Sequence, residues 1–276
     1  MKQTIKLWTL SAILAVICGV CVMTCYSSSG DAPSDSSRKE VRIAIAWRAD
    51  ADNEFCTNIV EAFREVGVTV TVLPQVKADY LDYSGDAVAA TCIDSCGIGY
   101  LSEASGALVR SRGCDGSNAA EVLSGVDGVI FTGGEDIAPT LLATPQDWHH
   151  IEAEIDYNAA RDVSDFLTMT YCLDHDIPLI GCPSWHHQAL LSTEGTPLRV
   201  TATTTVSGND MVEGIERTDK RCAVGVQFHP EAAIVKHTGK AVNSANADQF
   251  MAYDAAIPLF RAFIEVCKNG NNNDND

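Results

Sequence analysis

The chain has 276 residues, of which 46% are hydrophobic and 20% are charged, a composition that excludes a disordered protein and predicts one large core or two small ones. Its 19 basic and 37 acidic side chains give a formal charge of −18, which opposes binding to nucleic acid phosphates and anionic membranes. We therefore expect a small-molecule or peptide partner and no nucleic acid. An acidic substrate would need backbone amides or local arginines, for which Arg42, Arg48 and Arg161 are candidates.

The first 25 residues resemble an export signal. Lys2 and Lys6 precede an apolar run over residues 7–23, which gives the basic start and short apolar centre of a bacterial signal sequence. Residues 26–40 follow as a linker rich in Ser and Asp that we expect to be disordered. We expect an exported protein, either periplasmic or anchored at the bacterial cell envelope.

Cys25 suggests how an anchor could arise. It stands where a lipoprotein signal places its lipidated cysteine, although Thr24 occupies a position where Gly, Ala or Ser is usual. Lipidation and simple cleavage are therefore both open. A lipid on Cys25 is the only membrane contact that we expect.

Beyond the linker, predicted strands alternate with predicted helices. In chain order we expect a strand at 41–47, a helix at 53–66, a strand at 68–73, an insertion with short helices at 74–124, a strand at 127–132, a helix at 156–175, strands at 177–181, 196–206 and 221–228, and a helix at 246–267. This alternation predicts one α/β domain over residues 41–267, with a mainly parallel sheet and helices on both faces. Functional groups are expected at the carboxyl ends of the strands. The polar tail at 268–276 is expected to be disordered.

The cysteines do not form a metal-binding or disulfide pattern. Eight of the 11 lie beyond the leader, and the closest pair is Cys92 and Cys96. No second Cys/His pair with ligand spacing accompanies them, so we expect neither a metal nor another cofactor. Disulfide pairing and oligomeric state are left open.

Two strand ends offer catalytic groups. The strand at 221–228 leads to His229, and Glu231 follows two residues later, so the carboxylate could orient the imidazole as a general base. The strand at 127–132 ends on Gly133 and Gly134, whose amide groups could stabilise an oxyanion. Taken separately, each pattern is more often an ordinary loop or tight turn.

In combination, the segments GVIFTGGEDIAP, RDVSDFLTMTYCLDHDIPLIG, SWHHQAL and GVQFHPEAA resemble the class I glutamine amidotransferase-like superfamily, and in detail its gamma-glutamyl peptide hydrolase branch. The resemblance implies a flavodoxin-like fold and a cysteine hydrolase that cleaves gamma-glutamyl amides through a thioester. It implies that His229 is the base, Glu231 its orienting carboxylate, and Gly133 or Gly134 an oxyanion-hole donor. A substrate-binding role is implied for the motif residues Ser184, His186, His187 and Gln188.

The sequence departs from this family at Cys182. The family strand that corresponds to IPLIG runs into G-I-C-R-G, a nucleophile elbow that is followed by a helix. Here Gly181 is followed directly by Cys182, Pro183 and the substrate motif, so the fold is expected to be incomplete around the elbow. Pro183 has no N–H for an oxyanion hole, and Ile180 occupies a position that should be small.

Three interpretations follow. Cys182 is a substitute nucleophile; or the chain is an internally deleted relative that binds its ligand without turnover; or the elbow was lost when the sequence was assembled. The last two are favoured over the first. A glutaminase subunit that feeds a synthase is a weaker alternative, because the export signal would separate it from cytosolic partners.

Overall fold

The computed structural model describes residues 40–95, 99–142, 157–181, 190, 192–239 and 251–270. The predicted export signal, Cys25, the predicted linker up to residue 39 and the tail beyond residue 270 lie outside this description.

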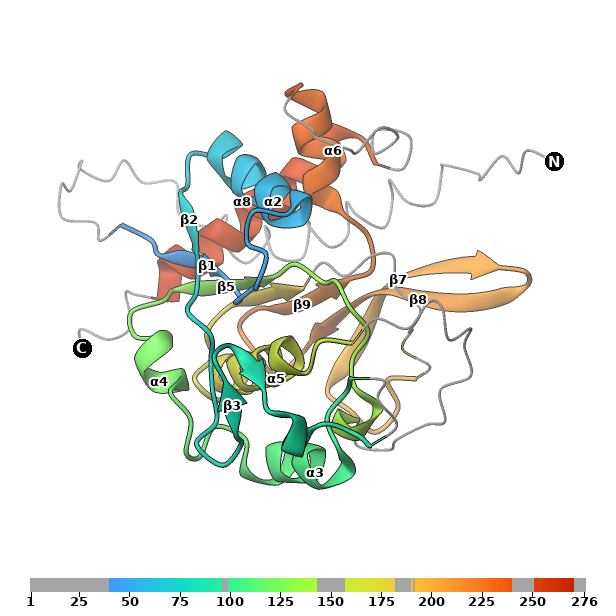
Figure 1. The fold of residues 1–276 in the computed structure, drawn as a ribbon. Coiled ribbons are helices and arrows are strands. Elements are labelled where there is room, and N and C mark those ends of the chain that lie inside the picture. Colours follow the sequence, from blue (N-terminus) through green and yellow to red (C-terminus); the bar gives the residue numbers. More distant parts are fainter. Residues whose placement is uncertain are drawn as a thin grey trace.

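A seven-stranded sheet forms the centre of the molecule (Figure 1). Its spatial order is β2-β1-β5-β6-β9-β8-β7, in which the first five strands are parallel and the last two are antiparallel to their neighbours. The strands are β1 (Ile43–Ile45), β2 (Val70–Val72), β5 (Gly128–Phe131), β6 (Leu179–Gly181), β7 (Leu198–Val206), β8 (Asn209–Arg217) and β9 (Ala223–Val226). The expected α/β, mainly parallel, flavodoxin-like fold is confirmed.

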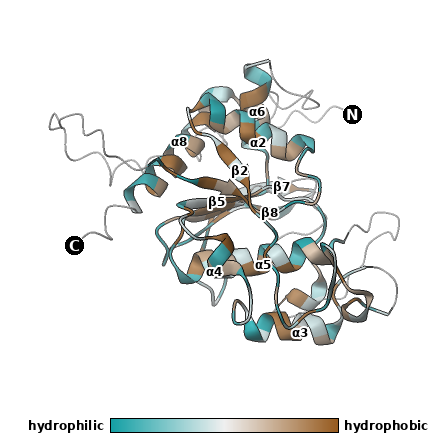
Figure 2. Ribbon diagram, turned by 60° about the vertical axis from the view of Figure 1, so that its left-hand side comes forward, coloured by the Kyte–Doolittle hydropathy of each residue, from teal (hydrophilic) through white to brown (hydrophobic). Residues whose placement is uncertain are grey.

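Helices cover both faces of this sheet (Figures 1 and 2). One face is covered by α2 (Glu54–Glu65), α6 (Pro230–His237) and α8 (Tyr253–Gly270), and the other by α3 (Glu103–Arg112), α4 (Ala119–Val122) and α5 (Ala159–Asp174). Strand residues point alternately to the two faces, so Ile130 packs with the α2, α6 and α8 layer while Val129 and Phe131 pack on the opposite side. None of the helices in the described residues is long and apolar enough to cross a membrane.

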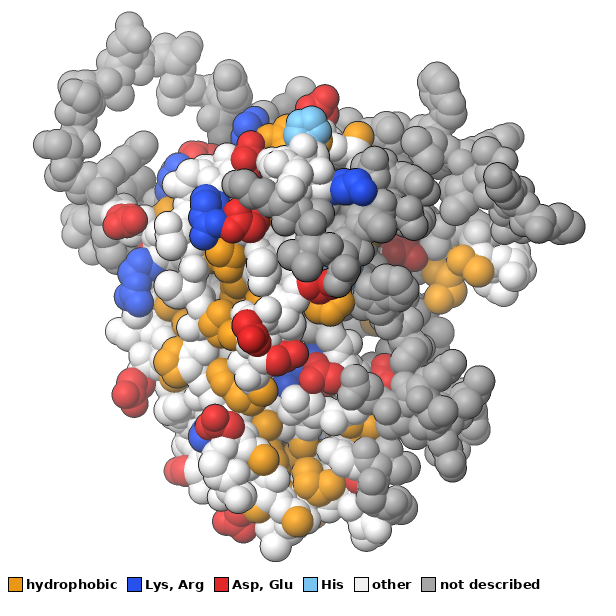
Figure 3. All heavy atoms as spheres, turned by 45° about the horizontal axis from the view of Figure 1, so that its top comes forward, with side chains coloured by type: hydrophobic (Ala, Val, Ile, Leu, Met, Phe, Trp, Pro, Cys, Tyr) orange, Lys and Arg blue, Asp and Glu red, His pale blue; other side chains and the backbone are white. Residues whose placement is uncertain are grey.

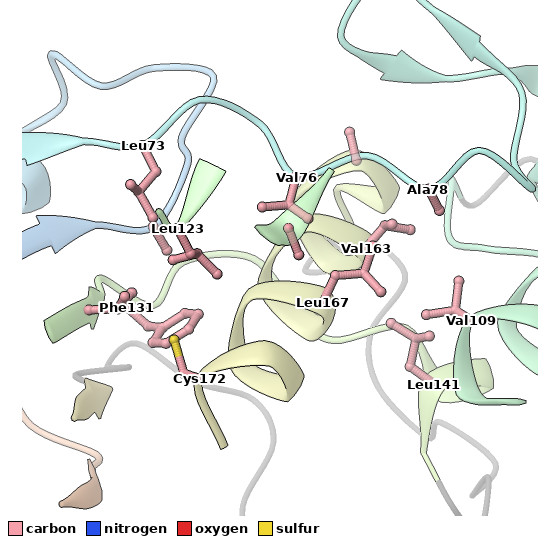
Figure 4. Close-up of a cluster of buried hydrophobic side chains, with 14 of the residues drawn as sticks. Leu73, Val76, Ala78, Val109, Leu123, Phe131, Leu141, Val163, Leu167 and Cys172 are labelled. Carbon is pink, nitrogen blue, oxygen red and sulfur yellow. The ribbon is translucent and has the colours of Figure 1, made fainter. Parts of the chain in front are cut away.

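The insertion between β2 and β5 is a folded part of the second layer. Besides α3 and α4 it forms a small two-stranded sheet, β3 (Tyr83–Ser84) and β4 (Ala87–Val88), and the 3-10 helix η1 (Ala90–Cys92); a further 3-10 helix, η2 (Pro139–Leu141), follows β5. Figure 4 shows Val109 of α3 and Leu141 of η2 beside Val163 and Leu167 of α5. The insertion therefore extends the core below the sheet.

The surface carries the acidic excess of the sequence. On the face drawn in Figure 3, acidic side chains are spread among the described residues, and basic side chains stand between them rather than gathering into a broad patch. A face of this kind does not attract a polyanion, because its positive groups lie beside negative ones.

Several elements differ from the sequence prediction, among them the strands β3 and β4 in an insertion that was expected to hold short helices. Strand β8 was not expected. It is joined to β7 by a two-residue turn of Ser207 and Gly208, in which both residues adopt positive φ (52° and 85°). Helix α6 was also not expected; its Pro230 occupies the first helical turn, where the missing N–H of proline is not needed for a helical hydrogen bond. Helix α8 begins at Tyr253 rather than 246 and continues to Gly270, three residues beyond 267.

Candidate functional site

The expected catalytic residues come from neighbouring strands. In the sheet order β1-β5-β6-β9, Phe131 pairs with Gly181 and Gly181 pairs with Gly225, so the three strands end at nearly the same level. The Gly133–Gly134 turn follows β5, and His229 follows β9. Strand β6 lies between them and ends where Cys182 begins in the sequence.

His229 and Glu231 contact each other as predicted. The imidazole Nδ1 is hydrogen-bonded to the Glu231 carboxylate oxygen Oε1. Glu231 lies in the first turn of α6, where the partial positive charge of the helix N-terminus stabilises a carboxylate, and its side chain is 1% exposed. An N–H group at Nδ1 would donate this hydrogen bond to the carboxylate, and Nε2 would then be the unprotonated, basic nitrogen.

The second ring nitrogen of His229, Nε2, is available to a reaction partner. Nε2 is buried and has no hydrogen-bond partner in the described part of the chain. Phe55, in the first turn of α2, stacks on the ring with the centroids 5.1 Å apart and the planes at 19°. Asn53 caps α2 by accepting a hydrogen bond from the Cys56 amide and so fixes where this helix begins. The ring is thus held by Glu231 and Phe55, while its basic nitrogen has no partner.

The Gly133–Gly134 turn has the backbone of an anion-binding loop. Gly133 has φ 73° and Gly134 has φ 129°, conformations that favour glycine. Within the residues that the structure describes, the N–H groups of Gly133, Gly134 and Glu135 donate no hydrogen bonds to other protein groups. Consecutive free amides beside left-handed backbone can receive an oxyanion or a carboxylate.

Two of the three arginines suggested for an acidic substrate are already paired. Arg48 Nη1 lies 2.9 Å from Asp165 Oδ1, and Arg161 Nε lies 3.2 Å from Asp165 Oδ2. Arg161 also contacts Glu135 Oε2 at 3.0 Å, and both arginines are less than 9% exposed. Arg42 precedes β1, at the amino end of the strands, and its guanidinium donates to a loop carbonyl there. The free amides are therefore better placed than the arginines to bind an anion.

Helix α5 also holds the far end of the loop that follows β5. The Ala138 amide donates to Asp162 Oδ2 at 3.0 Å. Burial raises the pKa of Asp162 to about 7, despite the opposing effects of Arg161 and of the Ala138 amide. Loop and helix are thus joined by a carboxyl group that titrates near neutral pH.

A nucleophile is not found among the described residues. Burial raises the pKa of four thiols, to about 11 for Cys114, to about 12 for Cys172, and also for Cys56 and Cys267, so these thiols resist ionisation. Cys92 lies in the insertion, and Cys222 precedes β9 at the opposite edge of the sheet. The predicted substitute nucleophile, Cys182, lies outside the description, as do Ser184, His186, His187 and Gln188.

The described cysteines and acids suggest no metal site. None of the six described cysteines forms a disulfide with another described residue, and no cluster of three or more potential ligands occurs among the residues in the description. Cys96, the second member of the closest sequence pair, is not included in it.

The fold and these residues define a class of protein: an α/β sheet that presents a histidine–carboxylate pair and a glycine turn at the carboxyl ends of its strands. A family model, Peptidase C26, matches residues 66–183 and 180–231, which together extend over more than half of the chain. The chain belongs to this family, which is class I glutamine amidotransferase-like and includes gamma-glutamyl hydrolases. No curated protein matches the chain.

The family match consists of two segments that meet near Cys182. The two matched segments overlap at residues 180–183, so the match is divided where β6 passes into the Cys182 segment. A family segment absent from this chain would divide the match at that point.

Proposed function

We propose that the protein binds gamma-glutamyl amides or peptides at the carboxyl edge of its sheet, and that the chain as written does not turn them over. The observation that supports this most strongly is the His229–Glu231 pair, because Nε2 is buried, oriented and without a partner among the described residues. This pair would supply the general base of a cysteine-hydrolase site and the carboxylate that orients it. Such a site also needs a nucleophilic cysteine on an elbow, which is expected after β6, where the family match is divided.

The residues present have definite roles if a thiolate is supplied at this position. His229 Nε2 would take the thiol proton while sulfur attacks the gamma-carbonyl carbon, and the Gly133 and Gly134 amides would bind the resulting oxyanion. The proton would then pass to the departing amine, and water would hydrolyse the thioester to release glutamate. In the chain as written, Cys182 is joined to Pro183, which cannot supply the amide that an elbow contributes.

Turnover and binding can be measured separately. We expect purified protein to release no glutamate from gamma-glutamyl-p-nitroanilide or gamma-glutamyl-gamma-aminobutyrate, and Cys182→Ser to behave identically. Calorimetry should detect binding of the second compound. His229→Gln should weaken it about tenfold, since one hydrogen bond in a buried site is worth roughly 1–1.5 kcal/mol.

His237→Gln is the matched control, because His237 lies on the same helix but stacks on Tyr253 at its other end. Glutamate release that disappears in Cys182→Ser would make Cys182 the nucleophile and overturn the non-catalytic proposal. The encoding DNA distinguishes a natural deletion from an assembly error: a segment between the codons for Gly181 and Cys182 would restore the elbow.

We also propose that the protein is exported, on the basis of Lys2, Lys6 and the apolar run at 7–23. Expression in a bacterial host should place it beyond the inner membrane. Radiolabelled palmitate incorporated by the wild type and lost in Cys25→Ala would establish a lipid anchor. Labelling that persists in Cys25→Ala would argue against that residue.

A further inference from the structure

A network of buried charges lies beside the Gly133–Gly134 turn. Arg48 and Arg161, from the end of β1 and from α5, share the carboxylate of Asp165, each through a different oxygen. Their side chains are 4% and 8% exposed. Leaving either arginine without its partner at this depth would be costly, so the two guanidinium groups are firmly placed.

Both guanidinium groups also contact the backbone of the turn. Arg161 Nη1 donates to the Glu135 carbonyl at 2.5 Å. Arg48 Nε donates to the Thr132 hydroxyl at 2.7 Å, and that hydroxyl donates to the Gly133 carbonyl at 3.2 Å. Arg48 Nη2 itself lies 3.5 Å from the same carbonyl. The carbonyls of Gly133 and Glu135, the two residues that flank Gly134, therefore face the arginines.

This arrangement fixes the direction of an amide group. All peptide bonds in the description are trans, and a trans peptide points its N–H opposite to its carbonyl. Because the Gly133 carbonyl faces Arg48, the Gly134 N–H points away from the arginines. That N–H donates no hydrogen bond within the described chain and is available to a ligand.

Glycine alone would not hold this geometry. The positive φ angles of Gly133 and Gly134 are accessible to glycine, but glycine also has the largest backbone freedom to lose. Preorganised donors are effective because they need not reorient when charge develops. A turn made of two glycines therefore needs external contacts to keep its amides in one orientation.

We infer that Arg48 and Arg161, joined through Asp165, are positioning residues that hold the Gly133–Glu135 turn with the Gly134 N–H directed away from the arginines and toward the bound gamma-glutamyl group. The inference rests on the proposed function for the identity of the ligand. The holding of the turn itself does not, because it can be observed in the free protein.

Backbone nitrogen-15 relaxation tests the inference in the free protein. In the wild type, the order parameters of Gly134 and Glu135 should be near the rigid value of about 0.85. Arg161→Met and Arg48→Met should lower them below about 0.6, while Val129 of β5 stays rigid and shows that the fold is retained. Arg161→Lys should largely restore the wild-type values, because its ammonium can still donate to the Glu135 carbonyl.

Arg42→Met is the matched control, since the Arg42 guanidinium also donates to a loop carbonyl, that of Ser124, but at the other end of the sheet. It should leave Gly134 rigid. If Arg161→Met does not fold, Arg48→Met decides, because it leaves Arg161 paired with Asp165 and Glu135 and so leaves no buried charge without a partner. Wild-type order parameters at Gly134 in Arg48→Met, or in a folded Arg161→Met protein, would overturn the inference.

Calorimetry with gamma-glutamyl-gamma-aminobutyrate separates this inference from the proposed function. We expect Arg161→Met to weaken binding about tenfold and Arg161→Lys to recover most of it. If the wild type does not bind the compound while the relaxation results are as expected, the proposed function fails and the turn-holding role remains. If the wild type binds and Arg161→Met binds equally well despite a mobile turn, the role of the arginines in ligand binding is refuted.

Discussion

Phe63→Ala should lower the free energy of unfolding by about 3–5 kcal/mol, the range typical of truncating a fully buried aromatic side chain. Phe63 on α2 is fully buried and makes edge-to-face contacts with two rings of α8: Phe260, with centroids 5.1 Å apart, and Phe263, at 6.4 Å. Removing the ring leaves a cavity between the two helices that pack on one face of the sheet. Because domains of this size are stable by roughly 5–15 kcal/mol, this is a large fraction of the total.

Urea unfolding measures this effect. The midpoint should fall while the dependence on denaturant concentration stays unchanged, since a core truncation changes stability rather than the surface exposed on unfolding. Val206→Ala is the control, because Val206 is 56% exposed and should change stability by less than about 0.5 kcal/mol. A loss below about 1 kcal/mol for Phe63→Ala would mean that α2 and α8 are not packed as described.

Asp162→Asn should change how stability depends on pH. The pKa of Asp162 is about 7 in the folded protein against an ordinary value of 3.8, so the folded state binds the proton more tightly than the unfolded state. This group therefore contributes stability that is fully present below about pH 3.8 and is lost as the pH rises toward 7. The shift is about 3 pKa units, which at about 1.36 kcal/mol per unit gives an upper limit of about 4 kcal/mol.

The comparison with asparagine isolates this contribution. In the Asp162→Asn variant, the side-chain amide oxygen can still accept the Ala138 amide hydrogen bond, but the side chain cannot ionise. Between about pH 4 and pH 8 the wild type should lose roughly 2–4 kcal/mol relative to Asp162→Asn, measured by urea unfolding at each pH. Asp86→Asn, at a side chain that is 74% exposed, should track the wild type throughout. A constant difference between Asp162→Asn and the wild type would show that Asp162 does not titrate in this range.

The most accurately predicted elements are those with local signals. The spacing of apolar residues at 53–66 predicted a helix, and α2 runs from Glu54 to Glu65 with Asn53 as its cap. The charged residues and glycine of Asn209–Arg217 gave no such signal, yet β8 forms because β7 and β9 pair with it on either side. Hydrogen bonding to the neighbouring strands overrode a weak local preference.

The candidate site was predictable in part. Glu231 follows His229 by two residues, so their contact could be anticipated from the sequence, and the structure brings them together. The stacking of Phe55 on His229 could not be anticipated, because α2 and α6 are far apart in the chain. The same holds for Arg48 and Asp165, which lie 117 residues apart, so an arginine suggested for substrate binding is instead paired with a carboxylate.

The sequence by itself determined the α/β class, the family and the residues at the strand ends, because periodicity, glycine pairs and short motifs are local properties of the chain. It also located the departure at Cys182, where one motif is joined directly to another. Only the tertiary structure decided, among the described residues, which charges neutralise one another and which polar atoms stay free: both guanidinium groups at the glycine turn are occupied, whereas His229 Nε2 and the Gly134 amide are not. Hydrogen bonds and ion pairs depend on distances between groups that are remote in sequence, and folding sets those distances.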